Sequence, residues 1–240
     1  LTFDNVDGQK TFWHTASHVL AQAVKRLYPN AKCAIGPAVD NGFYYDFDVE
    51  KPFSPEDLEK IKAEMKKIVK SGLELERVEL SPEEAEKKLE EMNEPYKVEL
   101  VKEHSDKGEH ITFYKQGEFI DLCAGPHLMS VAPIKAIELT ACTGAYWRGD
   151  ANNAQLCRVY GVAFPKASML EEHLKKLEEA KLRDHNKLGR ELEYFTTVDY
   201  VGQGLPILLP KGARVVQLLQ RWVEDVEQSK GCLLTKTPLL

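Results

Sequence analysis

Helical and extended patterns follow one another irregularly along the first two-thirds of the chain, and this order limits the possible folds more than any other feature. Residues 11–29 carry apolar side chains at helical spacing and stop at a proline. Residues 54–72 start with Ser-Pro-Glu and end at a glycine, and the same start recurs at residue 81. Residues 94–104 fit a strand or a helix, and we favour a helix.

Extended segments separate these helices. An Asn41-Gly42 turn predicts a hairpin that leads into an aromatic strand. The other predicted strands are 73–80, a hairpin over 110–123 that turns near Gln116-Gly117, and two strands at 134–150 and 154–165. Because the strands and helices lack a regular strand-helix-strand rhythm, we predict an α+β fold with an antiparallel sheet and packed helices.

The chain divides into three parts. The α+β pattern fills residues 1–165, and residues 166–193 predict one long charged helix with a leucine stripe, typical of a linker between domains. Residues 194–240 predict a loop, a short strand and an amphipathic helix, too little to close a core of their own. The chain begins without Met and stops just after an apolar stretch, so we expect a piece of a longer protein.

The net charge of −6 gives the chain no general attraction for nucleic acids or anionic membranes, although a local basic surface remains possible. No apolar run approaches the ~20 residues of a membrane helix, and no secretory signal is present. The five cysteines are odd in number and spread out, without a CxxC pair. We therefore expect a soluble cytoplasmic protein without disulfide bonds.

The segment HTASH places His14 and His18 four residues apart, on one face of the first predicted helix. This spacing suits a metal site or a base with its orienting partner. By itself the pair is weak evidence, since two such histidines also occur for packing or solvent contact.

The segment DLCAGPH adds Cys123 and His127, also four residues apart. Gly125 and Pro126 lie between them, so we expect a tight turn to present both side chains and Pro126 to open a short helical turn. Two histidines from a helix with a cysteine and a histidine from a turn match the ligands of a zinc site. They equally match a hydrolytic site with a base, an orienting group and a thiol. Both readings stay open at this point.

Five segments together resemble the bacterial-type threonyl-tRNA synthetase family, and the resemblance covers essentially the whole chain. They are HTASHVLAQAVKRLYP, IGPAVDNGFYYDFD, EPYKVEL, DLCAGPH and GAYWRGDANN, in that order. Alanyl-tRNA synthetase and free-standing editing proteins share a related pair of HxxxH and CxxxH motifs. GFYYDFD and GAYWRGD favour the threonyl family.

The resemblance implies that residues 1–165 form the second N-terminal, editing domain, which hydrolyses mischarged seryl-tRNA(Thr). Residues 166–193 are then the linker, and 194–240 the truncated start of the class II α/β catalytic domain. The segment VVQLLQRWVEDVEQSKGCLLTKTP resembles motif 1, which ends at Pro238 and builds the homodimer interface. The sites for ATP, Mg and the catalytic zinc fall outside these residues, so the resemblance implies no aminoacylation by this chain alone.

The resemblance also implies site residues. His14 and His18 would place and deprotonate a water, and an imidazole suits this near neutral pH. Asp121 would hold the seryl amino group or tune a histidine, with an ordinary turn residue as the alternative. Lys97 matches a position near the terminal adenosine, unless it is a surface lysine. Tyr45 would stack on or hydrogen-bond the adenosine, unless it only packs in the core.

Cys123 has three possible roles: a thiolate nucleophile, a zinc ligand, or a polar wall that senses the size of the substrate side chain. We favour the wall. His14, His18, Cys123 and His127 could bind zinc, as the corresponding set does in the alanyl relatives, but the threonyl resemblance implies editing without a cofactor. The rival function is a zinc-stabilised, non-catalytic module that docks the tRNA acceptor end.

Overall fold

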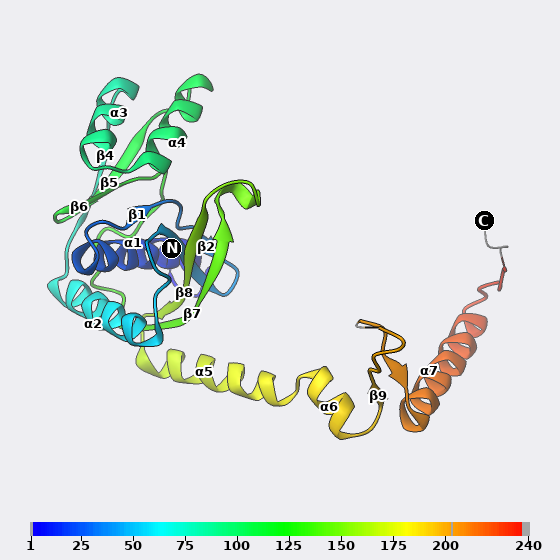
Figure 1. The fold of residues 1–240 in the computed structure, drawn as a ribbon. Coiled ribbons are helices and arrows are strands. Elements are labelled where there is room, and N and C mark those ends of the chain that lie inside the picture. Colours follow the sequence, from blue (N-terminus) through cyan, green and yellow to red (C-terminus); the bar gives the residue numbers. More distant parts are fainter. Residues whose placement is uncertain (1, 203, 237–240) are drawn as a thin grey trace. The chain divides into compact units, whose positions relative to one another are not determined.

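The computed structural model of the protein describes residues 2–202 and 204–236. The chain forms two compact units, Leu1–His173 and Leu174–Leu240. The first unit contains both helices and antiparallel sheets, which confirms the predicted α+β class (Figure 1). Its helices are α1 (Val6–Leu27), α2 (Pro55–Ser71), α3 (Pro82–Glu91), α4 (Pro95–Asp106) and the first part of α5 (Ala167–Leu182).

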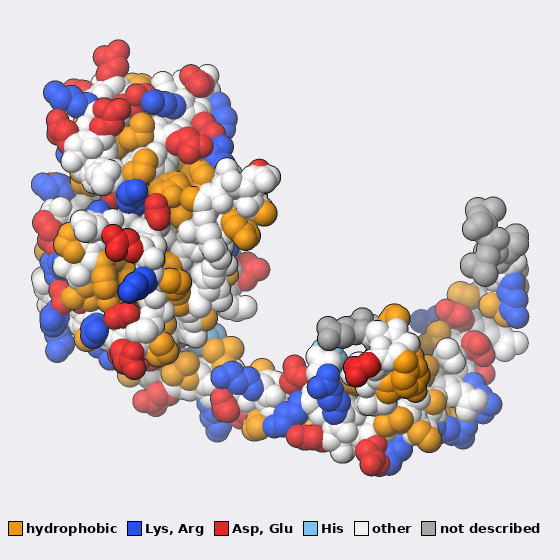
Figure 2. All heavy atoms as spheres, in the orientation of Figure 1, with side chains coloured by type: hydrophobic (Ala, Val, Ile, Leu, Met, Phe, Trp, Pro, Cys, Tyr) orange, Lys and Arg blue, Asp and Glu red, His pale blue; other side chains and the backbone are white. Residues whose placement is uncertain are grey.

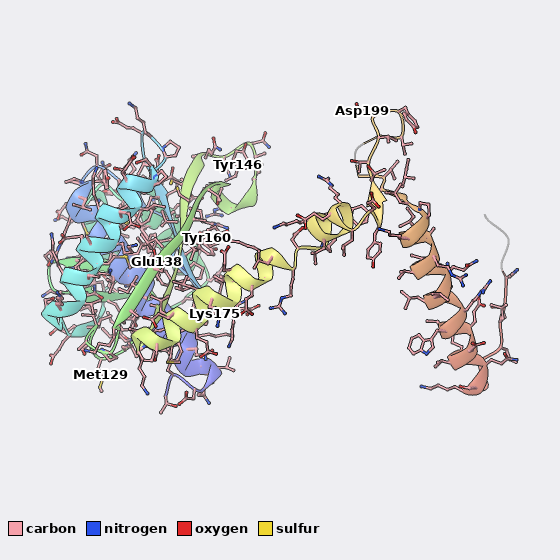
Figure 3. The ribbon with its side chains drawn as sticks, turned by 90° about the horizontal axis from the view of Figure 1, so that it is seen from below. Met129, Glu138, Tyr146, Tyr160, Lys175 and Asp199 are labelled. Carbon is pink, nitrogen blue, oxygen red and sulfur yellow. The ribbon has the colours of Figure 1, made fainter. Side chains whose placement is uncertain are left out.

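Two antiparallel sheets organise the first unit. The larger has the order β1-β3-β8-β7, with β2 paired to β3 at the end of a tight turn, and the smaller has the order β4-β5-β6. The strands are β1 (Lys32–Cys33), β2 (Ala38–Val39), β3 (Gly42–Asp48), β4 (Leu75–Glu79), β5 (Thr112–Gln116), β6 (Phe119–Leu122), β7 (Ala136–Tyr146) and β8 (Gln155–Phe164). Figure 3 shows Tyr146 near the tip of the long β7–β8 hairpin, with Tyr160 further along it.

Helix α1 is the centre of the main core. It begins earlier than its apolar pattern indicates, because the Asn5 side chain accepts a hydrogen bond from the backbone N–H of Asp7 and caps the helix. One face of α1 packs against Tyr45 and its neighbours on β3 and against α2. The Trp13 indole donates to the Ala163 carbonyl on β8 over 2.9 Å, which fixes the helix against the sheet.

The predicted helix starts at Ser54 and Ser81 are confirmed. Each serine accepts a hydrogen bond from a backbone N–H three residues later, and an acidic side chain at that position reaches back to the serine N–H. These reciprocal bonds satisfy donors that a helix terminus would otherwise leave unpaired. Residues Pro95–Asp106 form α4, so the preference for helix in this segment is also confirmed.

Strand β6 separates two cores because its side chains alternate. Ile120 and Leu122 face the small core that α3 and α4 build over the smaller sheet, whereas Phe119 packs into the main core. Asp121 points to the same side as Phe119 and is buried. Because of this alternation, the carboxylate of Asp121 points from β6 towards α1.

The second unit corrects one expectation. Residues 166–193 form two helices, α5 and α6 (His185–Glu191), where we predicted one. The helical structure is interrupted near Asp184, whose side chain accepts a hydrogen bond from the Lys187 N–H and caps the start of α6. Aspartate favours such a cap because its short carboxylate competes for backbone N–H groups.

The rest of the second unit contains the predicted short strand, β10 (Ile207–Leu208), and the predicted helix, α7 (Pro210–Ser229). A second strand, β9 (Phe195–Thr196), pairs with β10 and was not predicted. Apolar side chains remain exposed along α7, and Figure 2 shows hydrophobic side chains over this part of the chain. They include Val215, Val216, Leu218, Leu219, Trp222 and Val223. Pro238, the predicted end of motif 1, lies outside the described residues.

Among the helices of the described residues, none has the length and apolar character needed to cross a bilayer.

Candidate active site

Helix α1 presents the two histidines of the HxxxH pattern to a common point. The ring centroids of His14 and His18 lie 5.4 Å apart, and the rings are nearly perpendicular. His18 is buried and His14 is half-buried. The helix is held here by Ser17, whose hydroxyl lies 2.6 Å from the Gly36 carbonyl.

The segment after β6 presents the other two groups. The Cys123 N–H donates to the Thr112 carbonyl over 3.0 Å, and the Thr112 hydroxyl donates to the Cys123 carbonyl over 2.7 Å. The chain then continues without a helix, so the expected helical turn at Pro126 is wrong. The Gly125-Pro126 peptide is cis, and the backbone of Gly125 has φ +73°.

Gly125 is required at this point for two reasons. Its positive φ suits glycine, and a Cβ atom would lie 2.4 Å from the Tyr114 hydroxyl. In this conformation the backbone N–H of Gly125 donates a hydrogen bond to the sulfur of Cys123, with the nitrogen 3.3 Å from the sulfur. A tight, non-helical turn thus presents Cys123 and His127.

The four predicted side chains meet. The Cys123 Sγ lies 3.2 Å from His14 Nε2 and 3.1 Å from His127 Nε2. The ring centroids of His18 and His127 are 4.2 Å apart. One ligand atom from each of the four residues falls within 4.8 Å of all the others. Two segments that are more than 100 residues apart in sequence therefore form one cluster.

A buried carboxylate lies behind the cluster. Asp121 Oδ1 is 2.8 Å from the Lys97 ammonium, and Oδ2 accepts a hydrogen bond of 2.5 Å from the Tyr45 hydroxyl. Oδ2 also lies 3.6 Å from His18 Nε2. Lys97 and Asp121 are buried next to the cluster, so Lys97 is not an exposed surface lysine.

The position of Tyr45 corrects its expected role. The side chain is fully buried, its ring stacks on Phe47 at 4.9 Å, and its hydroxyl is bonded to Asp121. In this structure the ring offers no free face to an adenine. Tyr45 thus matches the alternative of a core residue, and its hydroxyl holds the Asp121 carboxylate beside His18.

A cleft of about 370 Å³ opens onto the cluster. His14, Cys123 and Asp121 contribute to its inner wall, while Gly36 and Leu100 supply backbone and apolar surface. A second cavity of about 190 Å³ lies beside it, and Lys97 and Asp121 line both. The ion pair is therefore a partition between the two spaces.

Burial sets the protonation states of the cluster. It lowers the pKa of His14, and it lowers the pKa of His18 and of His127 further, helped by repulsion from the neighbouring histidines. It also raises the pKa of the Cys123 thiol to about 12. At neutral pH the imidazoles are uncharged bases and Cys123 is a thiol.

Lys97 stays charged although it is buried. Burial lowers the pKa of its ammonium group, but the negative charge and the hydrogen bond of Asp121 oppose this and leave the pKa raised. The ion pair of Lys97 and Asp121 thus lies beside neutral imidazoles.

The donor set of the cluster fits a zinc ion. Three imidazoles and one cysteine are ligands that zinc accepts at a tetrahedral site. His18 Nδ1 is buried and finds no hydrogen-bond partner among the described residues, so it has a lone pair or a proton to offer a metal or a water. The same atoms fit a held water equally well, and the geometry allows both.

Sequence reasoning missed several residues of the site. Thr15 lies between the two histidines and contacts His127, and the cleft is also lined by His104, Glu109 and His110, to which we assigned no role. Thr15 carries a hydroxyl inside the HxxxH segment, but Ser17 does too, so this signal does not single out Thr15. Nothing in the pattern of α4 and β5 indicates that their ends meet at this cleft.

Comparison with known proteins places these features in a class. Residues 111–160, which contain β5, β6, the CxxxH turn, β7 and the first part of β8, match the family described as the threonyl and alanyl tRNA synthetase second additional domain. This stretch of the first unit thus falls in a class of additional domains of aminoacyl-tRNA synthetases.

The whole chain is similar to threonine–tRNA ligases. It is 62% identical over its full length to the enzyme of Clostridium perfringens (strain ATCC 13124), 58% to that of Clostridium botulinum (strain Alaska E43), and 53% to that of Caldanaerobacter subterraneus subsp. tengcongensis. The chain belongs to the threonyl-tRNA synthetase family, and it spans 37% of the length of these three relatives.

Proposed function

We propose that the cluster of His14, His18, Cys123 and His127 is an editing site that hydrolyses seryl-tRNA(Thr). One observation carries the proposal: basic, uncharged imidazoles and a thiol line an open cleft, backed by a buried Lys97–Asp121 ion pair. A structural metal site is closed and needs neither a cleft nor a charged pair behind it.

The chemistry of the two amino acids explains why such a site is needed. Serine lacks one methyl group of threonine, and a synthetic site rejects it by only about 1–3 kcal/mol. A second site that admits the smaller ester, excludes the methyl and cleaves the ester supplies the missing discrimination. The relatives are named threonine–tRNA ligases, so the seryl ester is the error that this chain would meet.

In the proposed reaction a water attacks the ester carbonyl that joins serine to the 3′ end of the tRNA. His14, which faces the cleft, accepts a proton from this water, and the buried His18 helps to hold the water in place. Asp121 orients His18 from 3.6 Å, while the Tyr45 hydroxyl holds Asp121. The Lys97 ammonium stabilises the negative charge that develops on the carbonyl oxygen. When this intermediate collapses, the ester C–O bond breaks, and His14 returns the proton to the departing 3′ oxygen of the tRNA as serine is released.

Cys123 forms part of the wall that measures the substrate side chain. Its thiol stays protonated at neutral pH, which makes it a poor nucleophile. The sulfur lies at the meeting point of His14, His127 and the Gly125 N–H, where an added methyl group of the substrate would collide with it.

Editing by this route needs no cofactor. If zinc binds, His14, His18, Cys123 and His127 would hold it, and it would supply a polarised water at neutral pH. ATP, Mg and the catalytic zinc serve the ligation of threonine to tRNA(Thr) and act outside these residues. The exposed apolar side chains of α7 would contribute to a homodimer interface in the whole enzyme.

The second candidate is a non-catalytic module that zinc stabilises and that docks the tRNA acceptor end. The convergence of four ligand atoms within 4.8 Å favours it. In that case loss of one ligand unfolds the domain and removes the metal, whereas an editing site can lose a base and stay folded.

Deacylation assays separate the two functions. We expect this chain to hydrolyse seryl-tRNA(Thr) and to spare threonyl-tRNA(Thr), also in the presence of a chelator. His14→Asn should keep the circular dichroism spectrum and lose the activity, and His185→Asn, on an exposed helix of the second unit, should lose neither. Unfolding of His14→Asn with loss of stoichiometric zinc would instead establish the structural module.

A further inference from the structure

Thr15 is a fully buried residue whose hydroxyl contacts three groups of the site. Its Oγ1 lies 2.9 Å from the Thr11 carbonyl one turn earlier on α1, 2.9 Å from the Leu128 N–H, and 3.2 Å from Nδ1 of His127. The residue therefore joins α1 directly to the turn that presents His127.

The hydrogen atoms of these three contacts can be assigned from chemistry. A hydroxyl donates one hydrogen and accepts through two lone pairs. A backbone N–H only donates, so Leu128 occupies one lone pair of the Thr15 oxygen. A carbonyl only accepts, and the contact to the Thr11 carbonyl is shorter than the contact to His127, so the hydroxyl hydrogen goes to Thr11.

The remaining lone pair of Thr15 faces Nδ1 of His127. A neutral imidazole carries its hydrogen on one nitrogen only. If that hydrogen were on Nε2, two lone pairs would face each other across 3.2 Å. With the hydrogen on Nδ1, the ring donates to Thr15, and its Nε2 lone pair points to the Cys123 sulfur at 3.1 Å.

We propose that Thr15 is a positioning residue that fixes His127 in the Nδ1–H tautomer. The inference deepens the proposed editing function, because it leaves Nε2 of His127 as an acceptor at the point where Cys123 and His14 meet. Cys123 can then donate its S–H to His127, and the Gly125 N–H occupies a lone pair of the sulfur. The thiol hydrogen then points to the imidazoles at this meeting point, to His127 at 3.1 Å or to His14 at 3.2 Å.

The test reads the tautomer directly. We would label the histidines with ¹⁵N, add a chelator so that no metal fixes the ring, and record long-range ¹H–¹⁵N spectra of the whole 240-residue chain. The His127→Asn spectrum identifies the His127 signals. The expected result is a protonated Nδ1 and an unprotonated Nε2, whereas a protonated Nε2 in the unaltered chain would overturn the inference.

Two variants extend the test. Thr15→Ser keeps the hydroxyl and should keep the tautomer, and Thr15→Val keeps the shape but removes the hydroxyl and should shift the ring towards the other tautomer. The kcat for seryl-tRNA(Thr) should fall roughly 10- to 100-fold in Thr15→Val and remain near normal in Thr15→Ser, with KM little changed.

The outcomes keep the two proposals apart. An unaltered chain with the expected tautomer but without deacylation would contradict the editing function and leave the role of Thr15 standing. A folded Thr15→Val chain that retains the tautomer would show that other groups set it, and would overturn the role of Thr15. If Thr15→Val does not fold, the spectrum of the unaltered chain still decides the tautomer.

Discussion

The ammonium of Lys97 on α4 lies 2.8 Å from the carboxylate of Asp121 on β6, and both side chains are buried. Their contact joins the α3–α4 layer to the edge of the main core. It also separates the cleft at the histidine–cysteine cluster from the second cavity, since both spaces are lined by these two residues. The pair thus links the stability of the first unit to the electrostatics of its site.

Asp121→Asn should destabilise the protein strongly. The substitution leaves the Lys97 ammonium buried without its counter-charge, and breaking a buried pair in this way costs about 3–5 kcal/mol of unfolding free energy. Urea unfolding followed by circular dichroism measures the loss. Adding Lys97→Met to Asp121→Asn removes both charges, so the double variant should be more stable than the sum of the two single losses predicts. Additive losses would contradict an interaction between the two side chains.

Cys123→Ser should retain most of the hydrolysis of seryl-tRNA(Thr). The proposed wall needs a small polar group at this position, and a serine hydroxyl supplies one. The measurement is the single-turnover rate of both chains, with mass spectrometry of the protein after acid quench. A serine thioester trapped on Cys123, together with an inactive serine variant, would identify the sulfur as a nucleophile.

The pH profile of deacylation should keep its activity below the usual titration range of histidine. The base must be uncharged, and burial lowers the pKa of His14 and of His18 from about 6.5. A base with a lowered pKa stays uncharged as the pH falls, so the acidic limb of kcat/KM should have its midpoint below pH 6.5. A midpoint at or above 6.5 argues against these buried imidazoles as the base.

Metal removal should leave the editing rate unchanged. The proposed base and the charged Lys97 complete the reaction without a metal ion, although the four donors fit zinc. Elemental analysis of the purified chain and assays before and after dialysis against chelator provide the measurement. One zinc per chain whose removal abolishes hydrolysis, with recovery on adding zinc back, would reverse this expectation.

Most of the fold follows from local signals in the sequence. The capped starts at Ser54 and Ser81, the Asn41-Gly42 turn and the alternating strands predict elements that the structure confirms. The break between α5 and α6 was missed because the leucine stripe continues across it. Asp184, which caps the start of α6, looks in the sequence like one more charge on a charged surface.

The site shows where local reasoning ends. The spacing of His14 with His18, and of Cys123 with His127, predicts which side chains converge, because each pair lies within one short element. The burial of Tyr45 could not be predicted, since it depends on the β3–β8 pairing and on α1 above it. The contact of Thr15 with His127 likewise spans 112 positions, and no pattern within either segment encodes it.

The distance along the chain between the two halves of the site determines when the site can form during synthesis and folding. His14 and Cys123 are 109 positions apart, so a growing chain completes α1 long before the cysteine turn is synthesised. Contacts of such separation form late in folding, because a long loop must close first. Hydrolysis would therefore begin only after the smaller sheet has docked on α1. A chain that formed every helix but misplaced the cysteine turn relative to α1 would not hydrolyse the ester. Measured activity would then report native tertiary packing in a newly made synthetase.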